Sequence, residues 1–60
     1  MKAPEIRERV LAYLVEHPEG LRLADLEEYF GMARIQMARM LRKMIDENKV
    51  RKEDLLYFAR

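Results

Sequence analysis

The 60-residue sequence contains no cysteine, serine, threonine or tryptophan. Without cysteine, neither a disulfide bond nor a thiolate zinc site can stabilise the fold. Because serine, cysteine and threonine are missing, the usual nucleophiles of covalent catalysis are missing too. A general-base enzyme would depend on a carboxylate or on the single histidine, His17, in a body with little room for the usual pocket of about 300 Å³ or more. We therefore expect no enzyme activity, no cofactor and no metal site.

Long hydrophobic runs are also missing. No apolar run approaches the roughly 20 residues that a membrane-spanning helix needs, and residues 1–5 lack the apolar stretch of a secretory signal. The expected compartment is therefore the cytoplasm, with no membrane partner. Half of the residues are hydrophobic and the net charge is only +1, which favours one folded domain over residues 1–60 rather than disorder. The composition, rich in Arg, Glu and Leu, is typical of a thermophilic source.

The charges are unevenly distributed along the chain. Residues 1–30 carry 4 basic and 7 acidic side chains, whereas residues 31–60 carry 8 basic and 4 acidic ones. The excess is concentrated between residues 34 and 52, where 7 basic side chains face 2 acidic ones. A basic segment in a nearly neutral chain indicates a polyanionic partner, although charges on solvated faces would give the same count.

The first helix is predicted to follow Pro4, which suits an opening helical turn, and to end at His17, because Pro18 disfavours helical geometry in the preceding residue. Its apolar positions recur at helical spacing: Ile6, Val10, Leu11, Tyr13 and Leu14. Val15 lies nearly opposite Ile6 and should be partly exposed. We interpret His17 as a residue that binds the terminal helix carbonyls rather than a ligand.

Two further helices follow a short extended segment at residues 21–23. The first runs over about residues 24–30, with a face predicted to be buried at Leu26, Tyr29 and Phe30. Gly31 ends it, since glycine adopts the left-handed conformation at little cost. The next helix covers residues 34–47 and is two-sided: Met37, Met40, Leu41 and Met44 share one face, and Ile35, Arg39 and Arg42 lie opposite. Asn48 is a plausible left-handed cap. The methionines are interpreted as core filling rather than as a protein-binding groove.

Residues 50–59 read as a β-hairpin, with Glu53 and Asp54 at the turn. Two registers are open at this point. A two-residue turn pairs Val50 with Tyr57, and a three-residue turn pairs Val50 with Leu56. In either register an apolar side chain among residues 55–58 faces outward.

This succession of elements resembles a winged helix-turn-helix DNA-binding domain, as a small standalone member. The resemblance covers about residues 6–59 and is carried by Leu26, Phe30, Gly31, Met32, Met37, Leu41, Met44, Asn48 and Val50. It implies an α+β, mostly α fold of three helices with a C-terminal β-hairpin wing. Some positions depart from the family pattern: Glu27 replaces a small residue, Arg22 and Ala33 replace cap residues, and Asn48 replaces a glycine.

The resemblance further implies a function in transcription regulation, with double-stranded DNA as the partner. In that family the third helix enters the major groove, which makes its first residues candidates for contact with base edges: Arg34, Ile35, Gln36 and Arg39. Arginine suits guanine, glutamine suits adenine, and an aliphatic side chain suits the thymine methyl group. Phosphate contacts are expected from the remaining basic residues of the helix and of the wing: Arg42, Lys43, Arg51 and Lys52.

A second function stays open from the sequence. Winged helices also serve as protein-protein interaction modules with no direct DNA contact, and the acidic first half with the apolar 55–58 strand would then be the contact surface. The same strand, together with Val15, is a candidate surface for a homodimer or a protein partner. No small-molecule effector is evident from the sequence.

Overall fold

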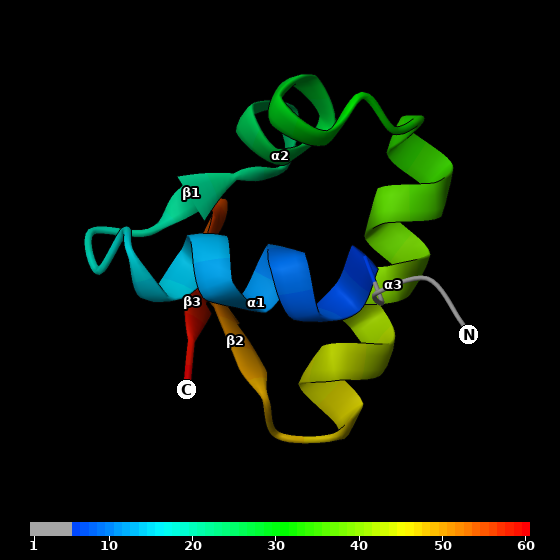
Figure 1. Cartoon of the computed structure of the whole chain (residues 1–60). Coiled ribbons are helices and arrows are strands. Elements are labelled where there is room, and N and C mark those ends of the chain that lie inside the picture. The colour runs from blue at the N-terminus through cyan, green and yellow to red at the C-terminus, as the bar shows by residue number, and fades with distance from the viewer. Residues whose placement is uncertain (1–5) are drawn as a thin grey trace.

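The computed structural model describes residues 6–60. Three helices and three strands follow one another in the order α1 (Ile6–Val15), β1 (Leu21–Arg22), α2 (Leu23–Phe30), α3 (Arg34–Asp46), β2 (Val50–Glu53) and β3 (Leu56–Ala59). Helix α1 runs across the middle of the molecule in Figure 1, with α2 above it and α3 to one side; at its other end β1 lies above it, and β2 and β3 extend below it. This is the predicted winged helix arrangement, mostly helical with a hairpin after α3.

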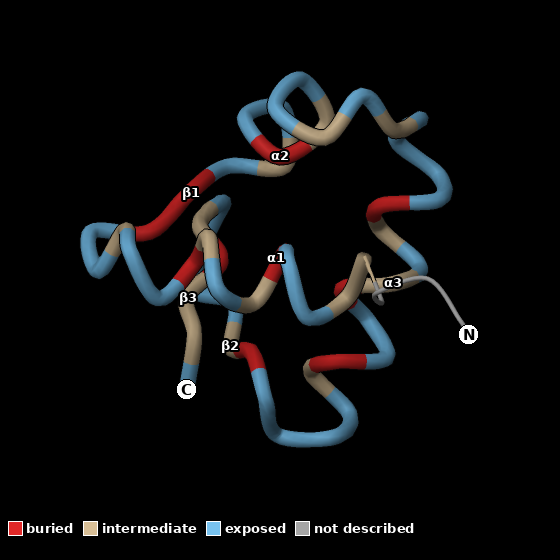
Figure 2. Tube along the Cα trace, in the orientation of Figure 1, coloured by how far each residue is buried: buried red, intermediate tan, exposed pale blue. Residues whose placement is uncertain are grey.

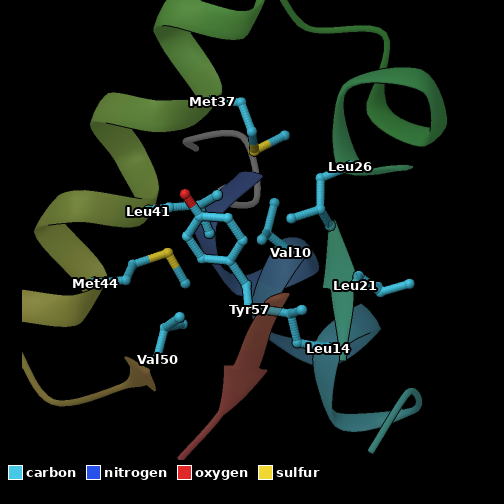
Figure 3. Packing of buried hydrophobic residues seen from close by; sticks show 9 residues of the cluster. All are labelled: Val10, Leu14, Leu21, Leu26, Met37, Leu41, Met44, Val50 and Tyr57. Carbon is cyan, nitrogen blue, oxygen red and sulfur yellow. The ribbon is translucent and has the colours of Figure 1, made fainter. Parts of the chain in front are cut away.

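One core joins all six elements. Its buried side chains come from every helix and strand and surround the inner side of α1 (Figures 2 and 3): Val10, Leu14, Leu21, Leu26, Met37, Leu41, Met44, Val50 and Tyr57. Met37 and Met44 lie within this cluster, and Met40 and Met32 pack against it. The interpretation of the methionines as core filling is therefore confirmed.

A hollow of about 490 Å³ lies on the exposed side of α1 and α2, and we call it the aromatic surface. Its lining consists of Ile6, Arg9, Ala12, Tyr13, Glu16, Tyr29 and Phe30. Tyr13 and Tyr29 are stacked there with 3.9 Å between ring centres, and Phe30 stands edge-on to both of them. Tyr29 is 62% exposed, although its helical spacing with Leu26 and Phe30 predicts a buried position. The prediction is wrong because its ring lies on Tyr13 instead of entering the core.

Helix α1 ends at Val15, two residues before the predicted end at His17. The chain tightens there, because the His17 N–H donates to the carbonyl of Leu14 at 3.0 Å, an i−3 bond that does not continue an α-helix. His17 Nδ1 lies 2.8 Å from the carbonyl oxygen of Tyr13, so its predicted role at the helix end is confirmed. Arg7 ties α1 to the far end of α3 through an ion pair with Glu47.

Two glycines shape the turns on either side of α2. Gly20, with φ +93°, precedes β1, and a Cβ there would lie 2.7 Å from the Phe58 ring. Gly31 ends α2 with φ +64°, and its left-handed conformation turns the chain into α3 as predicted. At the start of α2, the Arg22 N–H donates to the Asp25 carboxylate at 3.1 Å, which is the carboxylate half of a capping box and satisfies the N–H of the N-cap residue.

Helix α3 ends one residue before the predicted boundary at Glu47, and its end is closed by Asn48. Asn48 has φ +65°, the left-handed cap that the sequence predicts. The N–H of Lys49 donates to the Met44 carbonyl and that of Asn48 to the Ile45 carbonyl, both at 2.9 Å. These two bonds form a Schellman motif, which fixes the direction in which the chain leaves α3.

The sheet has the order β1-β3-β2, and all of its strands are antiparallel. Val50 pairs with Ala59, so both predicted registers of the hairpin are wrong. The turn lies one residue further along than predicted: Glu53 stays in β2 opposite Leu56, and Asp54 takes φ +60° in a two-residue loop with Leu55. Leu55 is 65% exposed at this loop, which confirms that one apolar residue of the segment 55–58 faces outward.

Candidate nucleic-acid interface

The two faces of α3 have opposite character. Met37, Leu41 and Met44 are at most 1% exposed and form its core face. The predicted site residues of this helix are all exposed: Arg34, Ile35, Gln36, Arg39, Arg42 and Lys43. Ile35 is 66% exposed although it is strongly apolar. The helix therefore presents one aliphatic, one amide and four cationic side chains to solvent.

The N-terminal end of α3 lies directly after the elbow at Gly31. Its N-cap residue, Ala33, provides no side-chain hydrogen bond. Arg34 is held by Glu27 of α2, with 2.9 Å between Arg34 Nε and the carboxylate oxygen. Glu27 departs from the family pattern, and the structure gives it a role: its carboxylate pairs with the first arginine of α3 across the turn. The pair fixes Arg34 beside Ile35 and Gln36.

A groove of about 620 Å³ separates α3 from the sheet. We call it the basic groove, and its lining consists of Ala38, Arg39, Met40, Arg42, Lys43, Ile45, Lys52 and Tyr57. Four of these residues are cations, and no carboxylate of the described residues 6–60 lines the groove. Arg42 and Asp46 stand at the spacing of a helical ion pair, but within that same part of the chain no ion pair joins them. The positive charge of the groove is therefore not compensated within its walls.

The two basic residues of the wing point to opposite faces of the sheet, because neighbouring residues of a strand alternate. Lys52 faces the basic groove, where its Nζ atom lies 5.6 Å from the centre of the Tyr57 ring. Arg51 lies on the other face, 4.3 Å from the centre of the Phe58 ring, and forms an ion pair with Glu53. The structure thus brings Lys52 together with Arg39, Arg42 and Lys43, and it separates Arg51 from them.

Sequence reasoning missed the floor of this groove. Met40, Ile45 and Tyr57 supply its apolar lining. Lys52 lies opposite Tyr57 only in the observed register of the hairpin. A prediction with the turn one residue too early therefore does not bring these two side chains together. The alternation of Arg51 and Lys52 could have been read from the strand pattern alone, and it would have assigned the two cations to different faces.

Other kinds of site are not supported by the described residues. Within residues 6–60 no group of three or more His, Cys, Asp or Glu side chains could hold a metal ion. Among the helices of this part, none has the length and apolar character that a membrane crossing requires.

A comparison with known families fits this geometry. The model of one family, the IclR helix-turn-helix domain, matches residues 9–54, from the first half of α1 to the end of the first wing strand. The chain belongs to the IclR helix-turn-helix family. An IclR helix-turn-helix domain is a DNA-binding, regulatory domain rather than a catalytic one, so DNA is the partner to which membership points. No curated protein and no solved structure matches the chain.

Proposed function

We propose that this IclR helix-turn-helix domain binds double-stranded DNA as a transcription regulator, with the exposed face of α3 in the major groove. Four residues at or near the start of α3 read base edges: Arg34, Ile35, Gln36 and Arg39. Their chemistry covers three kinds of base contact, namely guanine by arginine, adenine by glutamine and the thymine methyl group by isoleucine. Arg34 forms an ion pair with Glu27 in the free protein, so in this proposal its contact with guanine replaces that largely exposed pair.

The backbone of the DNA is contacted by the cations that stand further along the helix and on the wing. Arg42, Lys43 and Lys52 line the basic groove together with Arg39, and this shared position supports their assignment to phosphate contact. Arg51 is a further backbone contact in this proposal, on the outer face of the wing. Phosphate contacts fix the position and orientation of the protein, while the base contacts carry the sequence.

The observation that carries the proposal is the contrast between the two faces of α3. The core face is fully buried, and the opposite face combines an exposed isoleucine with cations that no carboxylate of residues 6–60 compensates in the groove. A merely solvated helix does not require an exposed isoleucine between arginines, and it gains nothing from uncompensated positive charge. DNA satisfies both features, because its phosphates are anionic and its major groove exposes the thymine methyl group.

The first experiment titrates the protein against random-sequence duplex DNA at increasing salt. With about 4–6 phosphate contacts, the logarithm of the binding constant should fall against the logarithm of the salt concentration with a slope of about −4 to −5. Absence of binding at low salt would contradict the proposal. It would favour the second reading, a winged-helix protein-protein interaction module.

A pair of alanine variants separates base reading from backbone contact. Arg39→Ala should weaken binding to a preferred site by about 1–3 kcal/mol and relax its sequence preference, whereas Lys43→Ala should weaken all sequences about equally. The two side chains are both exposed on α3, so each variant serves as the control for the other. Equal losses on every sequence for both variants would remove the base-reading role of Arg39.

A further inference from the structure

Two apolar side chains interrupt the polar side of α3 near its start. Ile35 is 66% exposed, and Ala38 is half-buried on the wall of the basic groove. Ala38 stands three residues after Ile35 and four before Arg42, so it lies between the two on the surface of the helix. We call Ile35 and Ala38 the apolar strip. Arg34 precedes the strip and Arg39 follows it, so the strip belongs to the face of α3 that contacts DNA in the proposed function.

The spacing of the strip along the helix is close to the spacing of base pairs. Three residues advance an α-helix by about 4.5 Å, and neighbouring base pairs are about 3.4 Å apart. The two side chains therefore reach neighbouring base pairs when α3 lies along the major groove. Neither side chain has a hydrogen-bond donor or acceptor, so neither recognises the polar groups of a base edge. The apolar group that the major groove offers to them is the methyl group at C5 of a pyrimidine.

We propose that the apolar strip contacts the C5 methyl groups of two neighbouring pyrimidines and thereby makes the domain sensitive to cytosine methylation. This inference rests on the proposed function and specifies its ligand. Thymine always carries the C5 methyl group. Cytosine has the same group at the same place in the major groove once it is converted to 5-methylcytosine. Methylation of a cytosine opposite the strip should therefore strengthen binding, although no hydrogen-bonding group of the base changes.

The size of the effect follows from the apolar area that one methyl group buries. Removing a methyl-sized group from water should change the dissociation constant by about threefold to fourfold. Ile35 offers more apolar atoms than Ala38, so the methyl group opposite Ile35 should contribute more. The effect is small beside the loss of a charged contact, and it is confined to two positions of the site.

The experiment starts from a duplex that the protein selects out of an unmethylated pool of random sequence. Each thymine of this duplex is replaced in turn by uracil, which lacks the methyl group and keeps every hydrogen-bonding group. The dissociation constant should rise about threefold to fourfold at two neighbouring positions and stay unchanged at the others. At those two positions a C·G pair is then compared with a 5-methylcytosine·G pair, and the methylated pair should bind more tightly by a similar factor.

Two variants assign each methyl group to its side chain. Ile35→Ala should bring the uracil-to-thymine ratio of dissociation constants toward one at one position, and Ala38→Gly should do so at the neighbouring position. Each ratio compares two duplexes on the same protein, so any loss of folded protein caused by a glycine in the helix cancels. Ile45→Ala is the matched control, because it shortens an aliphatic side chain of the same helix about 15 Å from Ile35. It should leave both ratios as they are in the wild type.

The outcomes distinguish this inference from the proposed function. If the protein binds duplex DNA but uracil has no effect at any position, DNA binding stands and the contact with methyl groups is wrong. A C·G pair that binds as tightly as its methylated form would refute the sensitivity to methylation. Unchanged ratios in both strip variants would assign the methyl contacts to other side chains and overturn the role of the strip. Absence of DNA binding at low salt would overturn the proposed function and this inference together.

Discussion

The basic groove and the aromatic surface are two exposed hollows of similar size, about 620 and 490 Å³, on one 60-residue chain. They differ in how their charges are arranged. The groove gathers four cations around an apolar floor and includes no anion among its described lining residues. The hollow on α1 and α2 is lined by one arginine and one glutamate among mostly apolar and aromatic residues: Ile6, Arg9, Ala12, Tyr13, Glu16, Tyr29 and Phe30. The two hollows therefore resemble each other in volume and differ in the charges that line them.

The contrast also relates to the segregation of charge along the sequence. The acidic half of the chain supplies α1 and α2, and the basic half supplies α3 and the wing. Folding places the positive excess on a surface that other parts of the chain leave open. A nearly neutral protein can thus present a strongly basic surface to DNA, provided that its acidic residues are kept on other elements.

The largest expected effect is the loss of both surfaces together. Leu41→Ala removes a fully buried side chain from the core face of α3 and should lower the free energy of unfolding by about 2–5 kcal/mol. This is a large part of the stability of so small a domain. Urea denaturation measures the loss. DNA binding should decline and the raised pKa of Tyr13 should fall toward its ordinary value, because α1 and α3 share the core.

Ile35→Ala is the matched control, since it shortens an aliphatic side chain on the opposite face of the same helix. Ile35 is 66% exposed, so the free energy of unfolding should change by no more than about 0.5 kcal/mol. The pKa of Tyr13 should be unaffected, and only binding to thymine-containing sites should weaken. If Leu41→Ala abolishes DNA binding but leaves the raised pKa of Tyr13 intact, the two surfaces do not depend on one core.

A smaller effect should separate the two faces of the wing. Lys52→Ala removes a cation from the basic groove and should make the salt slope of DNA binding shallower by about 0.9. Arg51→Ala should change that slope less, because Arg51 already stacks on Phe58 and pairs with Glu53. Salt titration of both variants on the same duplex gives the comparison. Equal changes in the salt slope would mean that both faces of the wing contact the DNA and that phosphate contact is not confined to the basic groove.

The smallest effect concerns the ionisation of the aromatic surface. Burial raises the pKa of Tyr13 above its ordinary value of 10.0, and the nearby charges of Tyr29, Asp25 and Glu16 add to the rise. The folded state therefore holds this proton more tightly than the unfolded state does. The resulting stability is fully present below pH 10 and is lost as the pH rises through the raised pKa of the folded protein. Ultraviolet titration of tyrosinate in wild type and in Tyr13→Phe should show that the variant lacks a component above pH 10. A lost component at or below pH 10 would contradict the raised pKa of Tyr13.

The helix-turn-helix could be predicted from the sequence almost to the residue, because its signals are local. Gly31 and Asn48 both take the left-handed conformation that the sequence predicts, and α3 differs from its predicted range by one residue. The apolar spacing of Met37, Leu41 and Met44 also suffices to assign the buried face of this helix. These features depend on helical periodicity and on backbone freedom at single positions, both of which are legible in sequence.

The wing and the aromatic surface could not be predicted to the same degree. The hairpin register depends on whether the loop begins at Glu53 or at Asp54. A shift of one residue in the loop changes every cross-strand pair of the hairpin. Tyr29 has the spacing of a core residue, but its position is decided by a ring on another helix. Both outcomes rest on contacts between two different elements, for which the spacing of residues within one element carries no signal.

The strand order has a consequence for the way in which the chain acquires its shape during synthesis. The middle strand of the sheet, β3, is the last element in sequence, and both β1 and β2 pair only with it. A nascent chain that has reached Leu55 holds two strand segments that have no hydrogen-bonding neighbour, and it lacks Tyr57 from the core. Both outer strands therefore gain their hydrogen-bonding partner only from residues 56–59, so the sheet depends on the last strand of the sequence.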